Sequence, residues 1–551
     1  MLDLTRRQST SYNPELKIWS GASEPSSYSN DLTIGEIIFE QLQKDPERIF
    51  QISHSEKTTL TRSQILQNAS KVGAYLRQEG FIEETDIVAI LAKNTTHVAS
   101  LAYGCMFNGT PFHTVHPDTI DNTICHLLNI TKPRIIFCCA EIFNKLKYVA
   151  DKMNSENKEF ETKIVIIDGI VEGVTNILDI FQIQLQLDYK PESFKNGIDR
   201  TLAILCSSGT TGTPKAVTFS NSRKIFEFYS YLSESDIQYS PSSLDWVSGL
   251  LVLTSAGVYG TLRVISKEVF SVASFLTICE EYKITWTLVP SSYISTLAHS
   301  PEINAKQLRT LRYILFGGDR CLSETLKKMQ LYLQFEGILH QGYGVTEMGS
   351  VVTWNFGPQS KLASVGTLQS KVQMRIVSES GEALGPNERG EIHCHLGQHW
   401  GGYYENIPAT REIQDSEGWI HTGDLGYFDD DNYLYIVGRK RDFLKFRTKM
   451  YYPREIEEVI AQMPEVAEVC VFGIWNEIDG DAAAASVVTK AGCQLTANQV
   501  LDFVAENISE NYKQLHAGVQ IVPNLAKNSN GKVKRQAVKE EFLKASQDKS
   551  K

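Results

Sequence analysis

The chain has 551 residues and a mass of 61.9 kDa, which is more than one ordinary hydrophobic core accommodates, so we expect at least two domains. Hydrophobic residues make up 42% of the chain and charged residues 22%, which indicates a globular and not a disordered protein. The formal net charge of −11 argues against general affinity for nucleic acid or for an anionic membrane.

The ten cysteines are scattered without a Cys-x-x-Cys pair, so the sequence predicts neither a zinc site nor a disulfide framework, and a reducing compartment is the simpler interpretation. Residues 1–7 turn polar at once and lack the apolar region of a secretion signal. The longest apolar stretch, residues 246–262, is interrupted by three glycines and flanked by Asp245 and Arg263. We therefore expect a buried strand-and-turn segment there, no integral membrane segment, and a cytoplasmic protein.

Helical and strand patterns alternate between residues 60 and 150. Residues 63–80 and 97–108 have the helical spacing of apolar residues, and residues 86–91 form a buried-strand run between them. Such alternation is typical of α/β layers with substantial parallel sheet. No internal repeat stands out, and we interpret the lysine-rich tail after Glu540 as a solvated end.

A loop rich in small and hydroxyl-bearing residues separates two strand-like runs, residues 202–206 and 216–219. Its glycines allow successive N–H groups to converge on an anion, its hydroxyls add donors, and its lysine supplies a mobile positive charge. The spacing is not that of a Walker A loop, and a lone Gly/Ser/Thr cluster is more often an ordinary polar turn, but the length and order of this one favour a polyphosphate site. The candidate phosphate-binding residues are Ser207, Ser208, Gly209, Thr210, Thr211, Gly212 and Lys215.

Further elements are predicted toward the C-terminus. A strand over residues 313–316 ends at Gly317 and Gly318, where bare backbone allows a ligand to approach closely. A helix that begins at Pro453 carries apolar residues at i, i+3, i+4 and i+7. We expect this helix to pack on a strand over residues 468–472 in a small C-terminal α/β domain.

Four more strings follow the phosphate loop in order: residues 341–347 (QGYGVTE), 418–424 (GWIHTGD), 438–442 (GRKRD) and 530–535 (NGKVKR). Together with the loop they resemble the signatures of the adenylate-forming, or AMP-binding, superfamily, in particular its acyl-CoA synthetases and beetle luciferases. The resemblance covers residues 201–535. It implies an α/β fold with a large multi-layer N-terminal domain, residues 1–437, and a small mobile C-terminal α+β domain, residues 438–551, with a hinge near Gly438.

The resemblance implies a reaction in two halves. A carboxylate attacks the α-phosphorus of ATP to give an acyl-adenylate and pyrophosphate, and the thiol of coenzyme A then displaces AMP. At the matching positions, Lys532 bridges the acyl carboxylate and the phosphate, and Thr346 contacts the α-phosphate. Glu347 helps to hold Mg²⁺, a cation that prefers hard oxygen ligands. Lys445 belongs to the face of the small domain that serves the thioester step.

The nucleotide is expected to lie among residues of the second, third and fourth strings. The ring of Tyr343 is expected to contact adenine, Gly344 is a further nucleotide-binding candidate, and the bare backbone of Gly317 and Gly318 lets adenine and the acyl chain approach closely. Asp424 accepts hydrogen bonds from both ribose hydroxyls, and Arg439 is a second ribose contact. Taken singly, Tyr343 is as often a core residue and Asp424 a turn aspartate, but their place within matching strings favours the functional interpretation.

The acyl pocket is expected to include Trp246, Ser350 and Val351. Many relatives carry a histidine-rich segment where this chain has residues 243–249 (SLDWVSG), so Trp246 takes the place of a pocket histidine, which disfavours a luciferase-like oxidation; a plain core tryptophan is the alternative. Thr448 stands where relatives have the glycine of a Lys-x-x-Gly motif. A β-branched residue there is expected to hinder the coenzyme A step more than adenylation.

The leading hypothesis is therefore an ATP-dependent ligase that joins a carboxylic acid, expected to be a fatty acid, to coenzyme A. Two alternatives stay open: an adenylate-forming enzyme with another acceptor or a luciferase-like oxidation, and a non-catalytic acyl or nucleotide binder, against which the presence of Lys532 counts. A dinucleotide oxidoreductase is excluded because Gly342-x-Gly344 lacks the third glycine, and a serine hydrolase because no Gly-x-Ser-x-Gly string occurs. Relatives are often peroxisomal, but residues 548–551 are not a Ser-Lys-Leu signal. The oligomeric state is left open.

Overall fold

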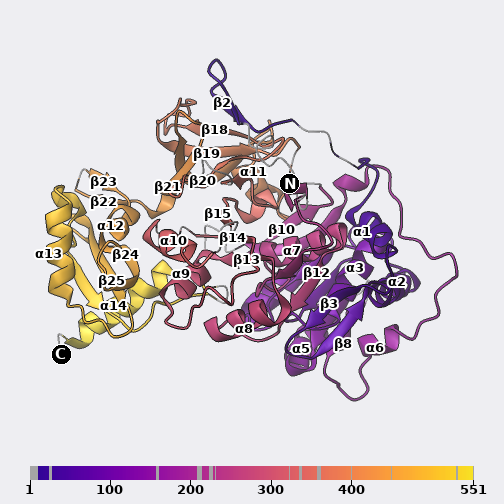
Figure 1. The fold of residues 1–551 in the computed structure, drawn as a ribbon. Helices are drawn as coiled ribbons and strands as arrows, with labels where there is room; N and C mark the ends of the chain where they lie inside the picture. The colour runs from indigo at the N-terminus through magenta and orange to yellow at the C-terminus, as the bar shows by residue number, and fades with distance from the viewer. Residues whose placement is uncertain are drawn as a thin grey trace.

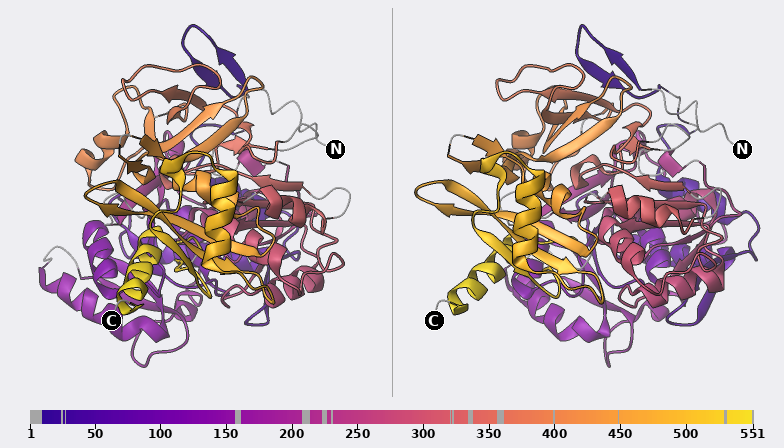
Figure 2. Two further views of the ribbon diagram at one scale, coloured as in Figure 1. Left: turned by 90° about the vertical axis from the view of Figure 1, so that its left-hand side faces the viewer. Right: turned by 60° about the vertical axis from the view of Figure 1, so that its left-hand side comes forward.

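The computed structural model describes residues 10–549 except for residues 24–25, 27, 157–160, 208–213, 223–226, 230, 320, 322, 334–337, 356–360, 399, 448 and 529–530. It has a large part with three sheets of six or seven strands and a smaller part, built from the C-terminal residues, on its left-hand side (Figure 1). Two turned views show the smaller part in front of the large one (Figure 2). The mixed α/β architecture confirms the predicted fold class.

The first sheet has the strand order β10-β9-β6-β5-β7-β8, and its strands are parallel except for the antiparallel pair of β9 and β10. Its short strands are apolar runs buried on both faces, as expected for a parallel sheet covered by helices. The bounds are β5 Val88–Leu91, β6 Phe112–Thr114, β7 Ile135–Cys139, β8 Lys163–Asp168, β9 Thr201–Ser207 and β10 Lys215–Ser220. The helices that follow or precede these strands are α2 Arg62–Gln78, α3 Val98–Asn108, α4 Asp121–Thr131, α5 Phe143–Glu156 and α6 Ile177–Ile180.

The second sheet has the order β15-β14-β13-β11-β12-β3-β4 and is parallel except for the hairpin of β3 and β4. Its strands are β3 Ile49–Ser53, β4 Thr58–Thr61, β11 Ile237–Tyr239, β12 Leu262–Ile265, β13 Trp286–Pro290, β14 Tyr313–Gly317 and β15 Ile338–Gln341. Its helices are α1 Ile34–Leu42, α7 Val247–Tyr259, α8 Val272–Tyr282, α9 Ser291–His299 and α10 Ser323–Gln330. The main hydrophobic core holds side chains from α2, α3 and α7 together with strands of both sheets.

The prediction of a strand and turn over residues 246–262 is wrong, because most of this segment is helix α7 and only its end joins β12. Helix α7 is apolar on nearly every side and buried, so its residues show no one-sided helical period. Its glycines serve packing: a Cβ on Gly249 would overlap the backbone of Ser243, and a Cβ on Gly257 would lie 2.8 Å from Ile38. Gly260, with φ of +65°, ends the helix in the left-handed conformation.

The third sheet is antiparallel and has the order β1-β2-β18-β19-β20-β21. Both views in Figure 2 show the N-terminal hairpin of β1 and β2 beside strands from the second half of the chain, where Trp19 pairs with Met374. The strands are β1 Ser11–Asn13, β2 Ile18–Ser20, β18 Gln373–Val377, β19 Gly390–His395, β20 Ile420–Phe428 and β21 Leu434–Arg439; helix α11 spans Ile407–Ile413, and a separate pair is formed by β16 Thr353–Trp354 and β17 Thr367–Leu368.

The smaller part has its own five-stranded sheet, in which β22, β23, β24 and β25 pair antiparallel and β26 joins β25 in parallel. Its core is separate, and it contains Ile456 and Ile460 from the predicted helix and Val471 from the predicted strand. Pro453 starts that helix, as expected. The bounds are β22 Leu444–Phe446, β23 Lys449–Tyr451, β24 Val466–Asn476, β25 Gly480–Thr489, β26 Gly518–Ile521, α12 Pro453–Ile460, α13 Ala497–Asn507 and α14 Arg535–Lys549.

Candidate active site

Three of the predicted nucleotide residues meet in one hydrogen-bonded group. The phenol of Tyr343 donates to Oδ2 of Asp424 over 2.8 Å, and Nε of Arg439 lies 3.1 Å from Oδ1 of the same carboxylate. Asp424 and Arg439 are opposite each other on the antiparallel strands β20 and β21, which explains why residues from two separate strings meet. The structure therefore brings together Tyr343, Asp424 and Arg439, the nucleotide corner.

The backbone of Asp424 is held in place as well as its carboxylate. It is only 5% exposed, its backbone N–H donates to Oγ1 of Thr422 over 3.0 Å, and Thr422 in turn donates to the carbonyl of Ile392 over 2.8 Å. Gly423 lies between them with φ of +67°, a conformation that glycine adopts without strain. The Thr-Gly-Asp sequence thus turns the carboxylate toward Tyr343.

Burial and neighbouring charges act in opposite directions on the nucleotide corner, and burial has the larger effect on Asp424. Burial raises the pKa of the Asp424 carboxyl, while the charge of Arg439, the hydrogen bond from Tyr343 and the charge of Lys532 oppose that rise. Burial also raises the pKa of the Tyr343 phenol, and the neighbouring Asp424 adds to the effect, so the phenol remains a donor. The corner can therefore offer a carboxylate to hydroxyl groups of a ligand.

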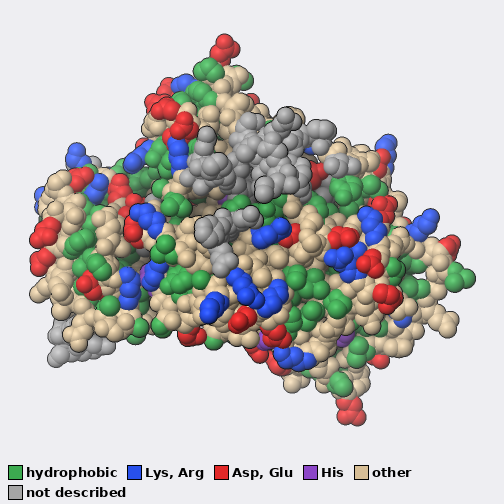
Figure 3. Space-filling model, in the orientation of Figure 1, with side chains coloured by type: hydrophobic (Ala, Val, Ile, Leu, Met, Phe, Trp, Pro, Cys, Tyr) green, Lys and Arg blue, Asp and Glu red, His purple; other side chains and the backbone are tan. Residues whose placement is uncertain are grey.

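The predicted loop between two strands is confirmed at both of its ends. Ser207 is the last residue of β9 and pairs with Lys215, the first residue of β10. The intervening candidates lie outside the described residues, namely Ser208, Gly209, Thr210, Thr211 and Gly212. Lys and Arg side chains gather near the middle of the face shown in Figure 3, although the net charge of the chain is −11.

Thr346 and Glu347, the last two residues of the string at 341–347, belong to a single 3₁₀ turn, η6 (Thr346–Met348). The carboxylate of Glu347 accepts a hydrogen bond of 2.7 Å from the phenol of Tyr403. The ammonium of Lys215 lies 4.7 Å from the centroid of the Tyr403 ring. Lys215, at the end of the predicted phosphate loop, and Glu347, the predicted metal-binding carboxylate, thus both contact Tyr403. The sequence analysis missed Tyr403, although the adjacent glycines of the string GGYY were a signal.

The predicted close-approach glycines lie at the carboxyl ends of β14 and β15. A Cβ on Gly317 would lie 2.9 Å from the carbonyl oxygen of Gly342, and a Cβ on Gly344 would overlap the carbonyl of Ser350. Gly318 has φ of +87° and open space where a side chain would be. In open α/β sheets ligands bind outside the carboxyl ends of strands, which is where these residues lie.

The three predicted acyl-pocket residues lie on different elements. Trp246 precedes helix α7 and is half-buried. Val351 packs with one methyl group over Gly342 and contacts the main core, as does Val247 beside Trp246. Ser350 is 3% exposed, and its hydroxyl has no hydrogen-bond partner among the described residues. A buried, unpaired hydroxyl beside Gly344 is available to a ligand group.

The C-terminal lysine loop docks on the large part of the molecule. Gly531 has φ of +76°, and a Cβ there would overlap Oγ of Ser292 and lie 3.0 Å from Tyr293, both in the first turn of α9. The neighbouring Lys532 is exposed, and its charge reaches the Asp424 carboxyl. Ser292 and Tyr293 are contact residues that no sequence motif indicated.

Lys445 is not part of this arrangement. It is exposed on β22 of the smaller part, and among the described residues its ammonium forms no ion pair. Its backbone N–H donates to Oδ2 of Asp481 over 3.2 Å. Thr448, the departure from the Lys-x-x-Gly motif, lies outside the described residues.

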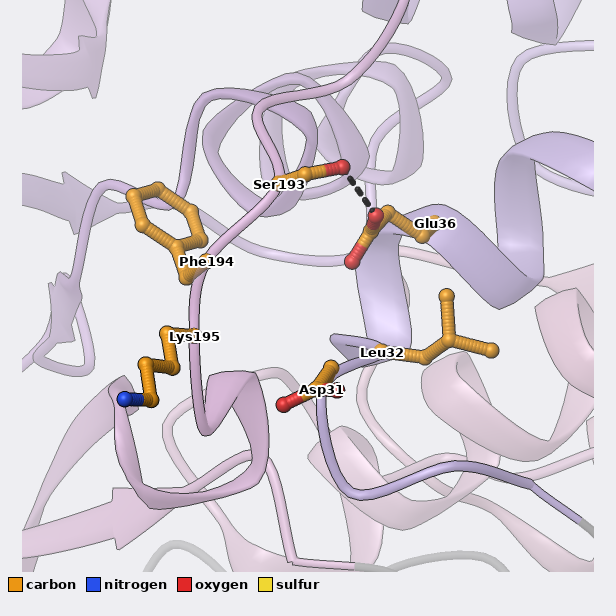
Figure 4. A pocket seen from close by; sticks show the side chains of 6 residues that line it. All are labelled: Asp31, Leu32, Glu36, Ser193, Phe194 and Lys195. Carbon is orange, nitrogen blue, oxygen red and sulfur yellow. Dashed lines mark hydrogen bonds between the residues drawn. The ribbon is translucent and has the colours of Figure 1, made fainter.

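A hollow of about 370 Å³ lies on the large part, and none of the predicted site residues lines it (Figure 4). It lies between the segment that precedes α1 and the chain around Ser193, whose hydroxyl donates to Glu36 over 2.6 Å. Glu36 also accepts from Thr33 as part of the capping box of α1, so its carboxylate already has a structural role.

No helix among the described residues is long and apolar enough to cross a membrane.

Both parts of the chain match models of known protein families. A family model described as AMP-binding enzyme matches residues 38–404, and one described as AMP-binding enzyme C-terminal domain matches residues 455–532. A luciferin 4-monooxygenase of Photuris pensylvanica is 28% identical over 542 residues, which cover 95% of this chain and 97% of that protein. A probable 4-coumarate–CoA ligase of Dictyostelium discoideum is 27% identical over 539 residues, which cover 92% and 95%. Among solved structures, an anthranilate CoA ligase in complex with anthranoyl-AMP shares the fold, with a TM-score of 0.83 and 18% identity over 93% of this chain and 98% of that one.

Proposed function

Because the chain belongs to the AMP-binding enzyme family, we propose that it is an ATP-dependent acid:CoA ligase that forms an acyl-adenylate and releases pyrophosphate and then AMP. The observation that carries this proposal is the position of Lys532, whose charge reaches the Asp424 carboxyl while its loop is docked on α9. A positive charge that acts on the nucleotide corner is what the adenylation step requires.

In the first half-reaction a carboxylate oxygen of the acid attacks the α-phosphorus of ATP, and the bond to the leaving pyrophosphate breaks. Negative charge develops on the α-phosphate and on the leaving group, so fixed cations lower the barrier more than a proton-transfer group would. Lys532 neutralises charge between the acid and the α-phosphate, which Thr346 also contacts. Lys215 and the loop from Ser207 to Gly212 bind the leaving phosphates, and Asp424 and Arg439 bind the ribose.

Glu347 fits the role of a Mg²⁺ ligand. It is a half-buried carboxylate, one oxygen of which accepts from Tyr403, and Mg²⁺ in nucleotide sites commonly uses one or two carboxylates together with substrate phosphates. The ion would supply further neutralisation of phosphate charge. What this chain contributes is the hydrogen bond from Tyr403, the residue whose ring also lies against Lys215 at the start of β10.

In the second half-reaction the thiolate of coenzyme A attacks the acyl carbonyl carbon, and AMP leaves with the electron pair of the broken C–O bond. We propose that the chain divides into residues 1–437 and 438–551 and that the smaller domain rotates about Gly438. This rotation replaces the Lys532 loop at the site by the face that carries Lys445. The exposure of Lys445 in the present orientation supports two different uses of the smaller domain.

The proposal also concerns which class of carboxylic acid is the substrate. Trp246 and Val351, which we propose as part of the acyl pocket, are apolar, and this favours a fatty acid. An aromatic acid is the second candidate, because relatives that align over most of this chain carry the name 4-coumarate–CoA ligase.

A panel of fatty and aromatic acids, assayed for pyrophosphate release with and without coenzyme A, tests the proposal. We expect release with one class, a thioester only when coenzyme A is present, and a loss of two to three orders of magnitude in Lys532→Ala, about 3–4 kcal/mol as for other single transition-state donors. Lys534→Ala, two residues along the same exposed loop, is the matched control. Pyrophosphate release that persists in Lys532→Ala within a few-fold of the unaltered protein would remove the lysine from the chemistry.

A further inference from the structure

The segment of residues 400–404, here called the clasp, pairs with β10 at the edge of the first sheet and ends shortly before α11. Tyr403 forms an antiparallel bridge with Val217 of β10, and the N–H of Tyr404 donates to the carbonyl of Ala216 over 2.8 Å. The carbonyl of Gly402 accepts from both the N–H and the hydroxyl of Thr218, at 3.2 and 2.7 Å. The clasp is therefore fixed to the strand that begins at Lys215.

The ring of Tyr403 is immobilised by its neighbours. It is 6% exposed and packs edge-on against Trp400, with ring centroids 5.0 Å apart, and the indole N–H of Trp400 donates to the carbonyl of Thr218 over 2.9 Å. The backbone N–H of Tyr403 donates to Oγ1 of Thr410 over 2.9 Å. Gly402 has φ of +89° and lies too close to Thr410 for a side chain, so the glycine lets the clasp approach α11.

The hydroxyl and the ring face of Tyr403 contact two different charged groups of the site. Its hydroxyl donates to Oε1 of Glu347 over 2.7 Å, and its face lies 4.7 Å from the ammonium of Lys215. Burial raises the pKa of Tyr403, and the charge of Glu347 raises it further, so the phenol stays protonated and donates. A hydrogen bond to a charged acceptor is stronger than one between neutral groups, and a cation over an aromatic face is attracted by the ring quadrupole.

We propose that Tyr403 is a positioning residue that holds Glu347 at its hydroxyl and Lys215 over its ring face, so that a divalent cation and a polyphosphate are received together. The inference rests on the proposed function of the site. It adds that different parts of this side chain serve the two ligands. The affinity for the cation depends on the hydroxyl, and the affinity for the nucleotide depends on the ring face.

Two variants separate these parts of the side chain. Tyr403→Phe removes the hydroxyl and keeps the ring, and Tyr403→Leu removes both. We expect the phenylalanine variant to bind ATP at saturating Mg²⁺ as the unaltered protein does, but to need about tenfold more Mg²⁺ to do so, because a hydrogen bond to a charged group has been lost. The leucine variant should also lose ATP affinity at saturating Mg²⁺. Tyr404→Phe, the next residue in the clasp, is the control and should change neither.

The measurements are calorimetric titrations of ATP at a series of Mg²⁺ concentrations, with melting temperatures of the ligand-free variants. In a Glu347→Gln background, Tyr403→Phe should have no further effect on the Mg²⁺ requirement, and this comparison remains available if Tyr403→Leu does not fold. An unchanged Mg²⁺ requirement in Tyr403→Phe would overturn the inference. If the unaltered protein itself binds no ATP, the proposed function fails instead, and the two failures are distinguishable.

Discussion

Tyr343 and Asp424 are 81 residues apart and joined by a hydrogen bond of 2.8 Å between the phenol and the carboxylate. The bond links the end of the second sheet to strand β20 of the third, because Tyr343 follows β15 and Asp424 lies on β20. A ligand that engages this carboxylate therefore contacts two sheets at once, which makes the pair the natural place to test nucleotide binding.

Asp424→Asn is expected to weaken ATP binding by about 1.5–3 kcal/mol, since charged hydrogen bonds to the ribose become neutral ones. The amide keeps the shape of the carboxylate, so packing around Tyr343 is conserved. Calorimetric titration of ATP checks the prediction, and Asp430→Asn, which removes the same charge from an exposed residue shortly after β20, is the control. Equal ATP affinity in the two variants would remove Asp424 from the site.

Gly531→Ala is expected to abolish most of the adenylation rate and to leave ATP binding intact. A side chain at this position is strained by φ of +76° and overlaps Oγ of Ser292, so the loop that carries Lys532 cannot dock on α9. Gly492→Ala is a matched control, because Gly492 has φ of +80° but open space around a Cβ. Pyrophosphate exchange should fall in the first variant alone; similar losses in both would attribute the effect to backbone strain.

Gly438→Pro is expected to spare adenylation and to slow thioester formation. Proline fixes φ and restricts the backbone about which the smaller domain is proposed to rotate. Gly438→Ala is the control, since a Cβ would come no closer than 3.3 Å to the Tyr452 ring and the backbone would remain free to turn. Pyrophosphate exchange and conversion of preformed acyl-adenylate are measured separately. A proline variant that lowers both half-reactions to the same extent would contradict the rotation.

His393 is expected to make the protein less stable as the pH falls from about 6.5 to about 4. Burial and the neighbouring His421 charge lower the pKa of His393 to about 4, whereas an unfolded histidine titrates near 6.5. Between these values the unfolded chain binds one more proton than the folded chain. The free energy of unfolding therefore has its highest value above pH 6.5 and falls below it, by about 3 kcal/mol at most.

The substitution His393→Phe tests this pH dependence, because a phenyl ring can keep the stacking on His421, whose ring centroid is 3.9 Å away. Denaturant unfolding at a series of pH values should show a shallower decline in the variant. His516→Phe, at an exposed histidine of the smaller part, should leave the slope as it is. If His393→Phe retains the full decline, other groups carry it.

Sequence patterns predicted local structure well where one period or one turn dominates. The strand before Ser207 and the strand after Lys215 pair as expected, and the helix from Pro453 begins at its proline. Helix α7 was mistaken for strand and turn because a helix buried on all sides has no polar face to reveal its period. Motif order indicated that Tyr343 and Asp424 belong to one site.

The contacts that complete the site could not be predicted from spacing. Tyr403 reaches Glu347 only because the clasp pairs with β10, a long-range pairing that no local pattern encodes. The docking of Gly531 on Ser292 likewise depends on how the smaller part is placed against α9. Such contacts are set by tertiary packing, which a single sequence does not express as a period.

The pairing of Trp19 with Met374 also bears on how the chain folds as it is made. Strand β2 leaves the ribosome early but has no partner in its sheet except β1 until β18 has been synthesised, on the order of tens of seconds later at typical translation rates. Strand β3 waits in the same way for β12, with which Ile52 pairs through Val264. The N-terminal strands are therefore exposed to other chains for much of synthesis, and we expect nascent-chain chaperones to be needed until the second half of the molecule arrives.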